Sequence, residues 1–152
     1  EFTGNTISGN FQRGFHGQSQ LGTGLLNLRF ANNILTGTAN AAAGALQGVF
    51  IETGGSADGH NNALCLDMAG NSVTMVDTTA YRLRNEGAPS GCPSCSFALE
   101  GFSGNGASAT DVSNWITGAP RSNTHSTSSA TPINIQIDNA FTTSAGCTAP
   151  TL

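Results

Sequence analysis

The chain has 152 residues, of which 68 are Ser, Thr, Asn or Gly and only 14 are charged. All five basic residues are Arg and the formal net charge is -4, so the clustered cations with which nucleic-acid binders replace phosphate counterions are missing. No apolar run approaches the roughly 20 residues of a membrane-spanning helix. The sequence therefore argues against a nucleic-acid partner and a transmembrane segment, and its length fits a single domain.

Short runs of alternating apolar and polar residues, bounded by Gly and Asn, follow one another along the chain. This alternation predicts half-buried β-strands. Helical spacing is rare, because Gly or clusters of Ser, Thr and Asn interrupt most windows. In chain order, we expect strands at 26–30, 49–51, 64–68, 81–83, 97–99 and 133–137.

The strand pattern repeats. Residues 26–36 align with 64–74 at a constant offset of 38, with the apolar residues in phase. The N-terminus matches the second half of this unit 28 residues earlier, and a fourth copy at 133–142 fits if one residue is deleted. Each unit therefore consists of a strand, a corner, a second short strand and a loop of variable length. The predicted corner residues are Asn5, Asn33, Asn71 and Asn139.

Asparagine suits such a corner because it tolerates the left-handed backbone conformation and can hydrogen-bond neighbouring peptide groups. A corner that recurs every 28 to 38 residues, with apolar residues in phase, is typical of a solenoid whose coils stack on one another. We therefore predict an all-β, right-handed parallel β-helix. A β-sandwich or antiparallel barrel would instead show hairpin turns about every 8 to 12 residues.

The pattern changes after the third copy. A short helix is predicted near 110–117, with Thr110 as its N-cap. Its apolar face would consist of Val112, Trp115 and Ile116. The predicted organisation is one domain with three parts. These are β-helix coils over 1–80, an elaborated, cap-like insertion with the helix and a Ser/Thr-rich loop over 81–131, and a last coil strand with the tail over 132–152.

Several motifs occur in a fixed order: Asn-cornered repeats, Leu-Cys-Leu-Asp-Met-Ala-Gly-Asn at 64–71, Tyr-Arg-Leu-Arg-Asn at 81–85, Phe-Ala-Leu-Glu-Gly-Phe at 97–102 and Asp-Val-Ser-Asn-Trp at 111–115. Over most of its length the chain thereby resembles the C-terminal end of long bacterial right-handed parallel β-helix repeat proteins. The resemblance implies secretion or surface display, an extended shape, and structural or adhesive roles. It supplies no catalytic residue.

The chain contains four cysteines, an even number that suits an oxidising, extracellular compartment. In Cys92-Pro-Ser-Cys95, a local structural disulfide is the first interpretation, although free thiols and a half zinc site completed by His125 and Cys147 stay open. Cys65 is either a small core residue or the partner of Cys147 in a disulfide that ties the tail to a coil.

No catalytic, cofactor or metal site is predicted. Asp67 and Arg29 occupy equivalent outward positions in successive copies, which favours a salt bridge between coils over a catalytic pair. The remaining acidic residues of interest, Glu52, Asp58 and Asp77, are expected in or beside loops. The histidines, His16, His60 and His125, show no relay spacing and are expected in solvated loops. The loop at 53–62 matches a calcium turn poorly.

Two further functional classes bear on the prediction, ice binding and carbohydrate chemistry. Ice binding by a β-solenoid requires Thr-x-Thr ladders. Only Thr36-Gly-Thr38 shows this spacing, and it is not repeated at the equivalent positions of the other copies, Ser8 and Thr74. Carbohydrate binding or polysaccharide degradation remains the alternative function. The main prediction is a non-enzymatic, extracellular or cell-surface structural or adhesive module. Its expected partners are further copies stacked end to end, as in a fibre, or upstream coils, with surface glycans as a further class.

Overall fold

In the computed structural model of the protein, the described residues are 1–9, 12–20, 22–37, 47–54, 61–75, 79–85, 95–127, 134–138, 141 and 147. They form twelve strands and one helix. In chain order these are β1 (Phe2–Thr3), β2 (Thr6–Gly9), β3 (Arg13–Ser19), β4 (Leu25–Ala31), β5 (Ile34–Gly37), β6 (Gln47–Thr53), β7 (Ala63–Ala69), β8 (Ser72–Met75), β9 (Thr79–Asn85), β10 (Ser96–Leu99), α1 (Ala109–Thr117), β11 (Thr124–Thr127) and β12 (Ile135–Asp138).

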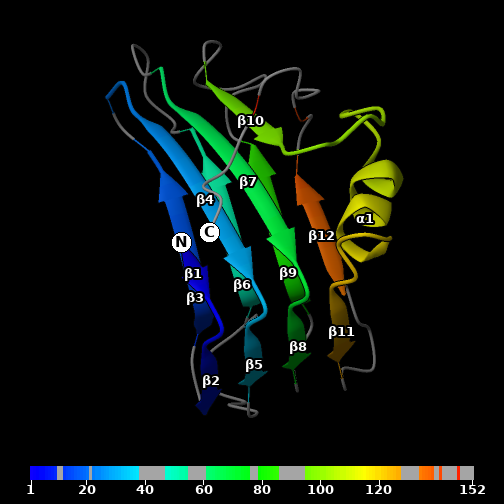
Figure 1. The fold of residues 1–152 in the computed structure, drawn as a ribbon. Coiled ribbons are helices and arrows are strands. Elements are labelled where there is room, and N and C mark those ends of the chain that lie inside the picture. Colours follow the sequence, from blue (N-terminus) through cyan, green and yellow to red (C-terminus); the bar gives the residue numbers. More distant parts are fainter. Residues whose placement is uncertain are drawn as a thin grey trace.

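The strands form three parallel sheets in which each strand pairs with the third strand before or after it. Sheet A has the order β1-β4-β7-β10, sheet B the order β2-β5-β8-β11, and sheet C the order β3-β6-β9-β12. We call each successive set of three strands a coil, so that coil 1 is β1 to β3 and coil 4 is β10 to β12. Figure 1 shows coil 1 and α1 at opposite ends of the stack. The all-β prediction is confirmed, and the strand order is consistent with a parallel solenoid.

The strand register confirms the first three sequence copies. Phe2 pairs with Phe30 at the offset of 28, and Leu26 pairs with Leu64 at the offset of 38. The predicted unit lacked one element, because each coil has a third strand in sheet C. The sequence copies did not include that strand because its offset differs from 28 and 38. Strand β3 pairs with β6 at an offset of 34, as in Phe15 with Val49.

The fourth sequence copy was assigned to the wrong sheet. Ile135 pairs with Tyr81 in sheet C, whereas the sheet A strand of coil 4 is β10. The alternation of apolar and polar residues is common to all strands, so a match in phase does not identify the sheet. The corner predicted at Asn139 lies outside the described residues.

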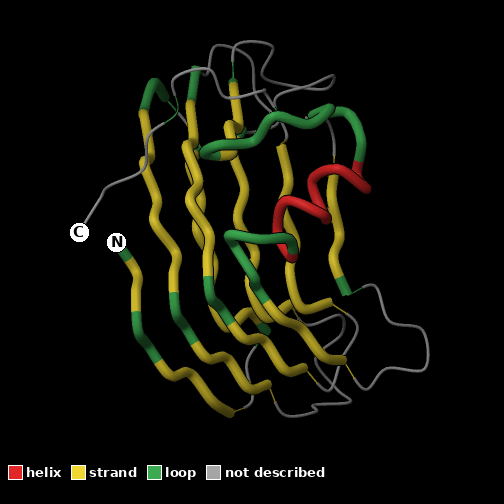
Figure 2. Tube along the Cα trace, turned by 45° about the vertical axis from the view of Figure 1, so that its right-hand side comes forward, coloured by secondary structure: helices red, strands yellow, loops and turns green. Residues whose placement is uncertain are grey.

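The segment 81–131, predicted as an elaborated, cap-like insertion, also contributes strands to the coils. It contains most of β9, all of β10 and all of β11, which extend sheets C, A and B respectively. The true addition is α1, which lies between β10 and β11 beside the last strands (Figure 2). None of the helices in the described part of the chain is long and apolar enough to cross a membrane.

The core lies between the three sheets, because the inward rows of each sheet are apolar. Leu64, Leu66 and Phe97 are fully buried in sheet A, and Tyr81 and Leu83 are fully buried in sheet C. At the end of the stack, α1 adds Val112 and Ile116, also fully buried, to the same core. The helix prediction is confirmed in position, but the N-cap is Ser108, whose hydroxyl accepts from Asp111 N at 3.2 Å.

Candidate functional site

A ladder of asparagine side chains connects the four coils at the corner between sheets A and B. Asn33 N and Nδ2 donate to Asn71 Oδ1 at 3.0 and 2.9 Å, and Asn71 N and Nδ2 donate to Asn123 Oδ1 at 3.0 and 2.7 Å. Asn5 donates to Asn33 Oδ1 in the same way. Each inner amide also donates to a carbonyl of the preceding coil, as Asn71 Nδ2 does to Phe30 O at 2.9 Å. The ladder therefore fixes the coils in register.

Of the two predicted roles of asparagine at this corner, hydrogen bonding to neighbouring peptide groups is confirmed, whereas the left-handed backbone conformation is not its own. The residue in the left-handed conformation is the one before the ladder asparagine. Gly70 has a φ of 66° before Asn71, and Ser122 has a φ of 51° before Asn123. The ladder residue is selected by its amide, which both donates and accepts, and not by its tolerance of positive φ.

The C-terminal end of the ladder is closed. Asn123, which the sequence analysis missed, has no fifth asparagine beyond it in the described part of the chain. Its Nδ2 and N donate instead to Ile116 O of α1 at 2.7 and 3.3 Å. The helix carbonyl thus accepts from the same two donors that bind the next asparagine elsewhere in the ladder. The signal that could have found Asn123 is the segment Ser122-Asn123-Thr124-His125-Ser126, which resembles Gly70-Asn71-Ser72-Val73-Thr74.

The N-terminal end of the ladder is open. No donor among the described residues reaches Asn5 Oδ1, and Asn5 Nδ2 donates to Thr3 O of its own coil at 3.1 Å, where the inner ladder amides donate to a carbonyl of the coil before. In the described part of the chain, β1, β2 and β3 each pair on one side alone, as β10, β11 and β12 do at the other end, but no helix packs beside the N-terminal three. The core residues Phe2, Ile7 and Phe15 are correspondingly half-buried.

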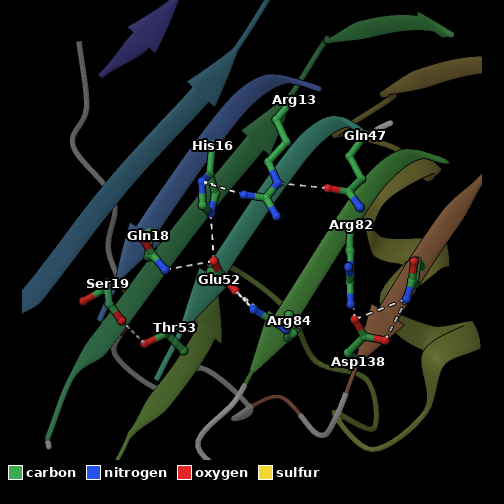
Figure 3. A network of polar contacts seen from close by, with 11 residues as sticks. Arg13, His16, Gln18, Ser19, Gln47, Glu52, Thr53, Arg82, Arg84 and Asp138 are labelled. Atoms are coloured by element: carbon green, nitrogen blue, oxygen red, sulfur yellow. Dashed lines mark hydrogen bonds and ion pairs between the residues drawn. The ribbon is translucent and has the colours of Figure 1, made fainter. Parts of the chain in front are cut away.

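The outer face of sheet C carries a polar network (Figure 3). Its centre is Glu52, which is 2% exposed. Glu52 Oε1 accepts from Gln18 Nε2 at 2.9 Å and lies 2.8 Å from His16 Nε2. Glu52 Oε2 accepts from Arg84 Nε at 2.8 Å. Since Arg13 contacts His16 Nδ1 at 3.4 Å, these partners assign the His16 proton to Nε2, which donates to the carboxylate.

An aromatic ring lies at the middle of this outer face. Phe50 is 1% exposed although it belongs to an outward row, because three guanidinium groups cover it at 4.8, 4.9 and 5.2 Å from the ring centre. They belong to Arg13, Arg82 and Arg84, and His16 stacks on the same ring at 4.9 Å. The cluster is held together by cation–π contacts and by its carboxylates.

This network was not predicted from the sequence. His16 and Glu52 were expected in or beside loops, but they lie within β3 and β6. Their convergence follows from the sheet C register, which places Gln18, Glu52 and Arg84 in one outward row, and the 34-residue offset hid it. Glu52 is engaged by His16, Gln18 and Arg84, and Arg82 pairs with the nearby Asp138 at 2.8 Å. The network therefore joins the strands of sheet C through their outward side chains.

The outer face of sheet A carries two of the predicted contacts. Arg29 and Asp67 pair in register, at 3.8 Å between Nε and Oδ2, while Arg121 contacts Asp67 more closely. Cys65 forms a disulfide with Cys147, and it faces outward instead of lying in the core row.

The other cysteine prediction is tested at one of its two residues. Cys95 is also disulfide-bonded. Its predicted partner Cys92 lies outside the described residues, as do Asp58, His60 and Asp77.

His125 was expected in a solvated loop, but it lies in β11 and continues the core row of Leu35 and Val73. Its ring meets Tyr81 edge-on at 6.4 Å, and its buried Nδ1 has no hydrogen-bond partner. Burial raises the pKa of the Tyr81 phenol above its ordinary value of 10.0. Among the described residues, no cluster of His, Cys, Asp or Glu could hold a metal ion.

A pocket of about 460 Å³ lies between α1 and the segments on either side of it. Arg121 lies 4.6 Å above the centre of the Trp115 ring, whose Nε1 donates to Glu100 O at 3.1 Å. Arg121 also contacts Asp67 and Glu100 O, so these groups hold the helix against the coils. The remaining lining includes Phe102, Ser103, Asp111 and Asn114.

The outer face of sheet B presents Ser or Thr side chains in every coil. Two hydroxyl residues at alternate positions occur in three of the four coils, at Thr6 and Ser8, at Ser72 and Thr74, and at Thr124 and Ser126, whereas coil 2 has Ile34 and Thr36. None of these is a Thr-x-Thr pair, and the pair noted in the sequence, Thr36 and Thr38, begins at the second outward position of its strand. Thr38 lies outside the described residues.

No family model, curated protein or solved structure matches the chain. The resemblance to bacterial β-helix repeat proteins therefore rests on the sequence motifs.

Proposed function

We propose that the chain is a non-enzymatic structural or adhesive module of an extracellular, right-handed parallel β-helix, and that further coils add to its N-terminal edge. The observation that carries this proposal is the difference between the two ends of the asparagine ladder. One end finishes on Ile116 O of α1, and at the other no described residue donates to Asn5 Oδ1. Strand edges that are neither paired nor covered are the usual site of β-strand addition.

The ladder also indicates what kind of coil fits. A coil of the same winding would present an asparagine whose N and Nδ2 donate to Asn5 Oδ1, as Asn33 donates to Asn71. It would also offer a backbone carbonyl to Asn5 Nδ2 in place of Thr3 O. Half-buried Phe2, Ile7 and Phe15 would then be covered by the apolar rows of the added coil.

Head-to-tail stacking of identical copies fits this edge less well. The opposite end of the molecule is covered by α1, and Asn123 has already given both of its donors to Ile116 O. A second copy could present these donors only if α1 moved away, which would expose the buried Val112 and Ile116. We therefore propose coil addition at the N-terminal edge in preference to a head-to-tail fibre.

The other parts of the proposal rest on chemistry. Two disulfide-bonded positions, the Cys65–Cys147 bridge and Cys95, favour an oxidising compartment. Glu52 and Asp67 are each held by arginine, as structural carboxylates commonly are, whereas glycoside hydrolysis uses a pair of carboxyl groups that flank the substrate. These observations support a structural role over an enzymatic one.

The test appends one coil. Residues 25–62 followed by 25–28 are placed directly before residue 1, which sets the appended Asn33 38 residues ahead of Asn5 in register. We expect the thermal unfolding midpoint to rise by about 5 °C, because buried apolar area and hydrogen bonds are added. The matched control carries Asn33→Asp in the appended copy alone, which removes the Nδ2 donor, and should lose much of this gain.

Two results would contradict the proposal. An appended coil that stays sensitive to protease and leaves the midpoint unchanged would show that the edge accepts no coil. Regular fibres of the unmodified chain in electron microscopy would instead support head-to-tail stacking.

Carbohydrate binding is a second candidate, favoured by the pocket beside α1. Its wall combines the aromatic residues Phe102 and Trp115 with the exposed polar residues Ser103 and Asn114, a combination that suits a sugar ring and its hydroxyl groups. Glycan arrays test this candidate. Binding that is lost in Asn114→Ala but retained in Asn27→Ala, an exposed site on sheet A, would support it.

A further inference from the structure

The outer face of sheet B carries a regular two-dimensional array of hydroxyl groups. Each of its four strands presents two outward positions, and the register aligns them in two rows across the coils. Seven of these eight positions are Ser or Thr, one is Ile, and none is charged. Row one contains Thr6, Ile34, Ser72 and Thr124, and row two contains Ser8, Thr36, Thr74 and Ser126.

These hydroxyl groups are available to solvent. All eight residues are exposed except Ser72, which is half-buried, and none of the seven hydroxyls hydrogen-bonds to another described residue. The outer face of sheet C is different, because its polar side chains bind one another through ion pairs (Figure 3). The hydroxyl groups of sheet B are therefore exposed and unpaired by any described residue, whereas the polar side chains of sheet C bind one another.

The backbone fixes the spacing of the array. Neighbouring parallel strands lie about 4.8 Å apart, and alternate residues along a strand lie about 6.7 Å apart. The asparagine ladder adds rigidity, because each ladder residue directly precedes the first outward residue of its strand, as Asn71 precedes Ser72. The four short strands lie side by side in Figure 1. Hydroxyl oxygens thus repeat in two directions on a rigid support.

The chemistry of this face limits what it can bind. It offers no charge to an ionic ligand and no aromatic ring on which a sugar could stack. It does offer uncharged donors and acceptors in a repeating array, with methyl groups of Thr and the side chain of Ile34 between them. An ice surface is itself a neutral, repeating array of hydrogen-bond donors and acceptors. We infer that the outer face of sheet B binds ice by holding water in register with its hydroxyl rows.

This inference is independent of coil addition, since the array is complete within the described strands. It is tested with the full chain by ice recrystallisation inhibition and by fluorescent labelling of ice crystals. The double variant Thr36→Lys/Thr74→Lys places two large cations in the middle of the array, on exposed positions of β5 and β8. We expect the unmodified protein to coat ice and slow recrystallisation, and the double variant to lose both effects.

The matched control is Asn27→Lys, at an exposed outward position of sheet A, which should retain the activity. Circular dichroism and the unfolding midpoint verify that both variants are folded. Absence of any effect of the unmodified protein on ice would overturn the inference, as would equal losses in the two variants. Binding to insoluble cellulose or chitin that is lost in Thr36→Lys/Thr74→Lys, without binding to ice, would assign the array to polysaccharide instead.

Discussion

Asn71 is the residue on which the coil stack depends most. Its amide accepts from Asn33 and donates to Asn123 and Phe30 O, all in the buried interior. Replacing it with Ala leaves the donors of Asn33 and the Phe30 carbonyl unpaired, and each such group costs about 1–3 kcal/mol. We predict that Asn71→Ala lowers the free energy of unfolding by about 3 kcal/mol or more, measured by denaturant titration.

The end of the ladder supplies the control. Asn5→Ala removes the same side chain, but Asn33 Oδ1 still accepts from the backbone N of residue 5. The expected loss is therefore about 1 kcal/mol. Equal losses at the two positions would contradict the description of an open ladder end.

The ionisation of Tyr81 reports directly on burial in the core, because it is the single tyrosine of the chain. Its hydroxyl donates to Thr124 O at 2.9 Å, and burial raises the pKa of the phenol above 10.0. Because the folded pKa exceeds the unfolded one, the associated stability is complete below pH 10 and falls as the pH rises further. Near-ultraviolet absorbance should show no tyrosinate until the protein unfolds, and Tyr81→Phe should flatten the alkaline loss of stability. A normal titration in the folded protein would contradict this burial.

Among the secondary-structure elements, α1 has a different N-cap in the structure from the one predicted from sequence. The predicted N-cap was Thr110, whereas Ser108 is the cap observed. We predict that Ser108→Ala lowers the unfolding free energy by about 1 kcal/mol, while Thr110→Ala, at an exposed site within the first turn, changes it by less than about 0.5 kcal/mol. Denaturant titration of the two variants decides between the caps.

The disulfide between Cys65 and Cys147 ties two segments that are 82 residues apart in sequence. Closing a loop of this length removes chain entropy from the unfolded state worth about 4 kcal/mol. We predict that Cys147→Ala lowers the unfolding free energy by up to this amount, measured without reductant, while circular dichroism keeps its β-sheet signature. A variant of unchanged stability would show that the tail contributes nothing to the stack.

Much of the fold was accessible from sequence because adjacent coils repeat their side chains. Phe2, Phe30 and Met68 occupy one row of sheet A, and their matching phases revealed two of the three sheets. The strands of sheet C were not recognised as repeats because polar and aromatic side chains replace one another in its rows, as His16, Phe50 and Arg82 do. The polar network around Glu52 could not be predicted without that register.

The same limit applied at the ends of the ladder. Asn123 follows α1, so the helix shifts it 52 residues from Asn71 and out of the repeat. Its partner, Ile116 O, is a backbone atom that no side-chain pattern marks. The helix ends the ladder because it lies within hydrogen-bond distance of Asn123, which its residue types do not reveal.

Across the described part of the chain, the asparagine ladder has one end bonded to α1 and one open end, and this asymmetry underlies the proposed function. Amide hydrogen exchange of the unmodified protein, resolved by strand, tests it most directly. We predict that β2, at the open end, exchanges roughly 100-fold faster than β8, which is paired on both sides. The strand β11 is also an edge strand among the described residues, but the hydrogen bonds from Asn123 to Ile116 O of α1 hold the residue that precedes it, so it should exchange more slowly than β2. Equal protection of β2 and β8, or exchange of β11 as fast as that of β2, would contradict the account.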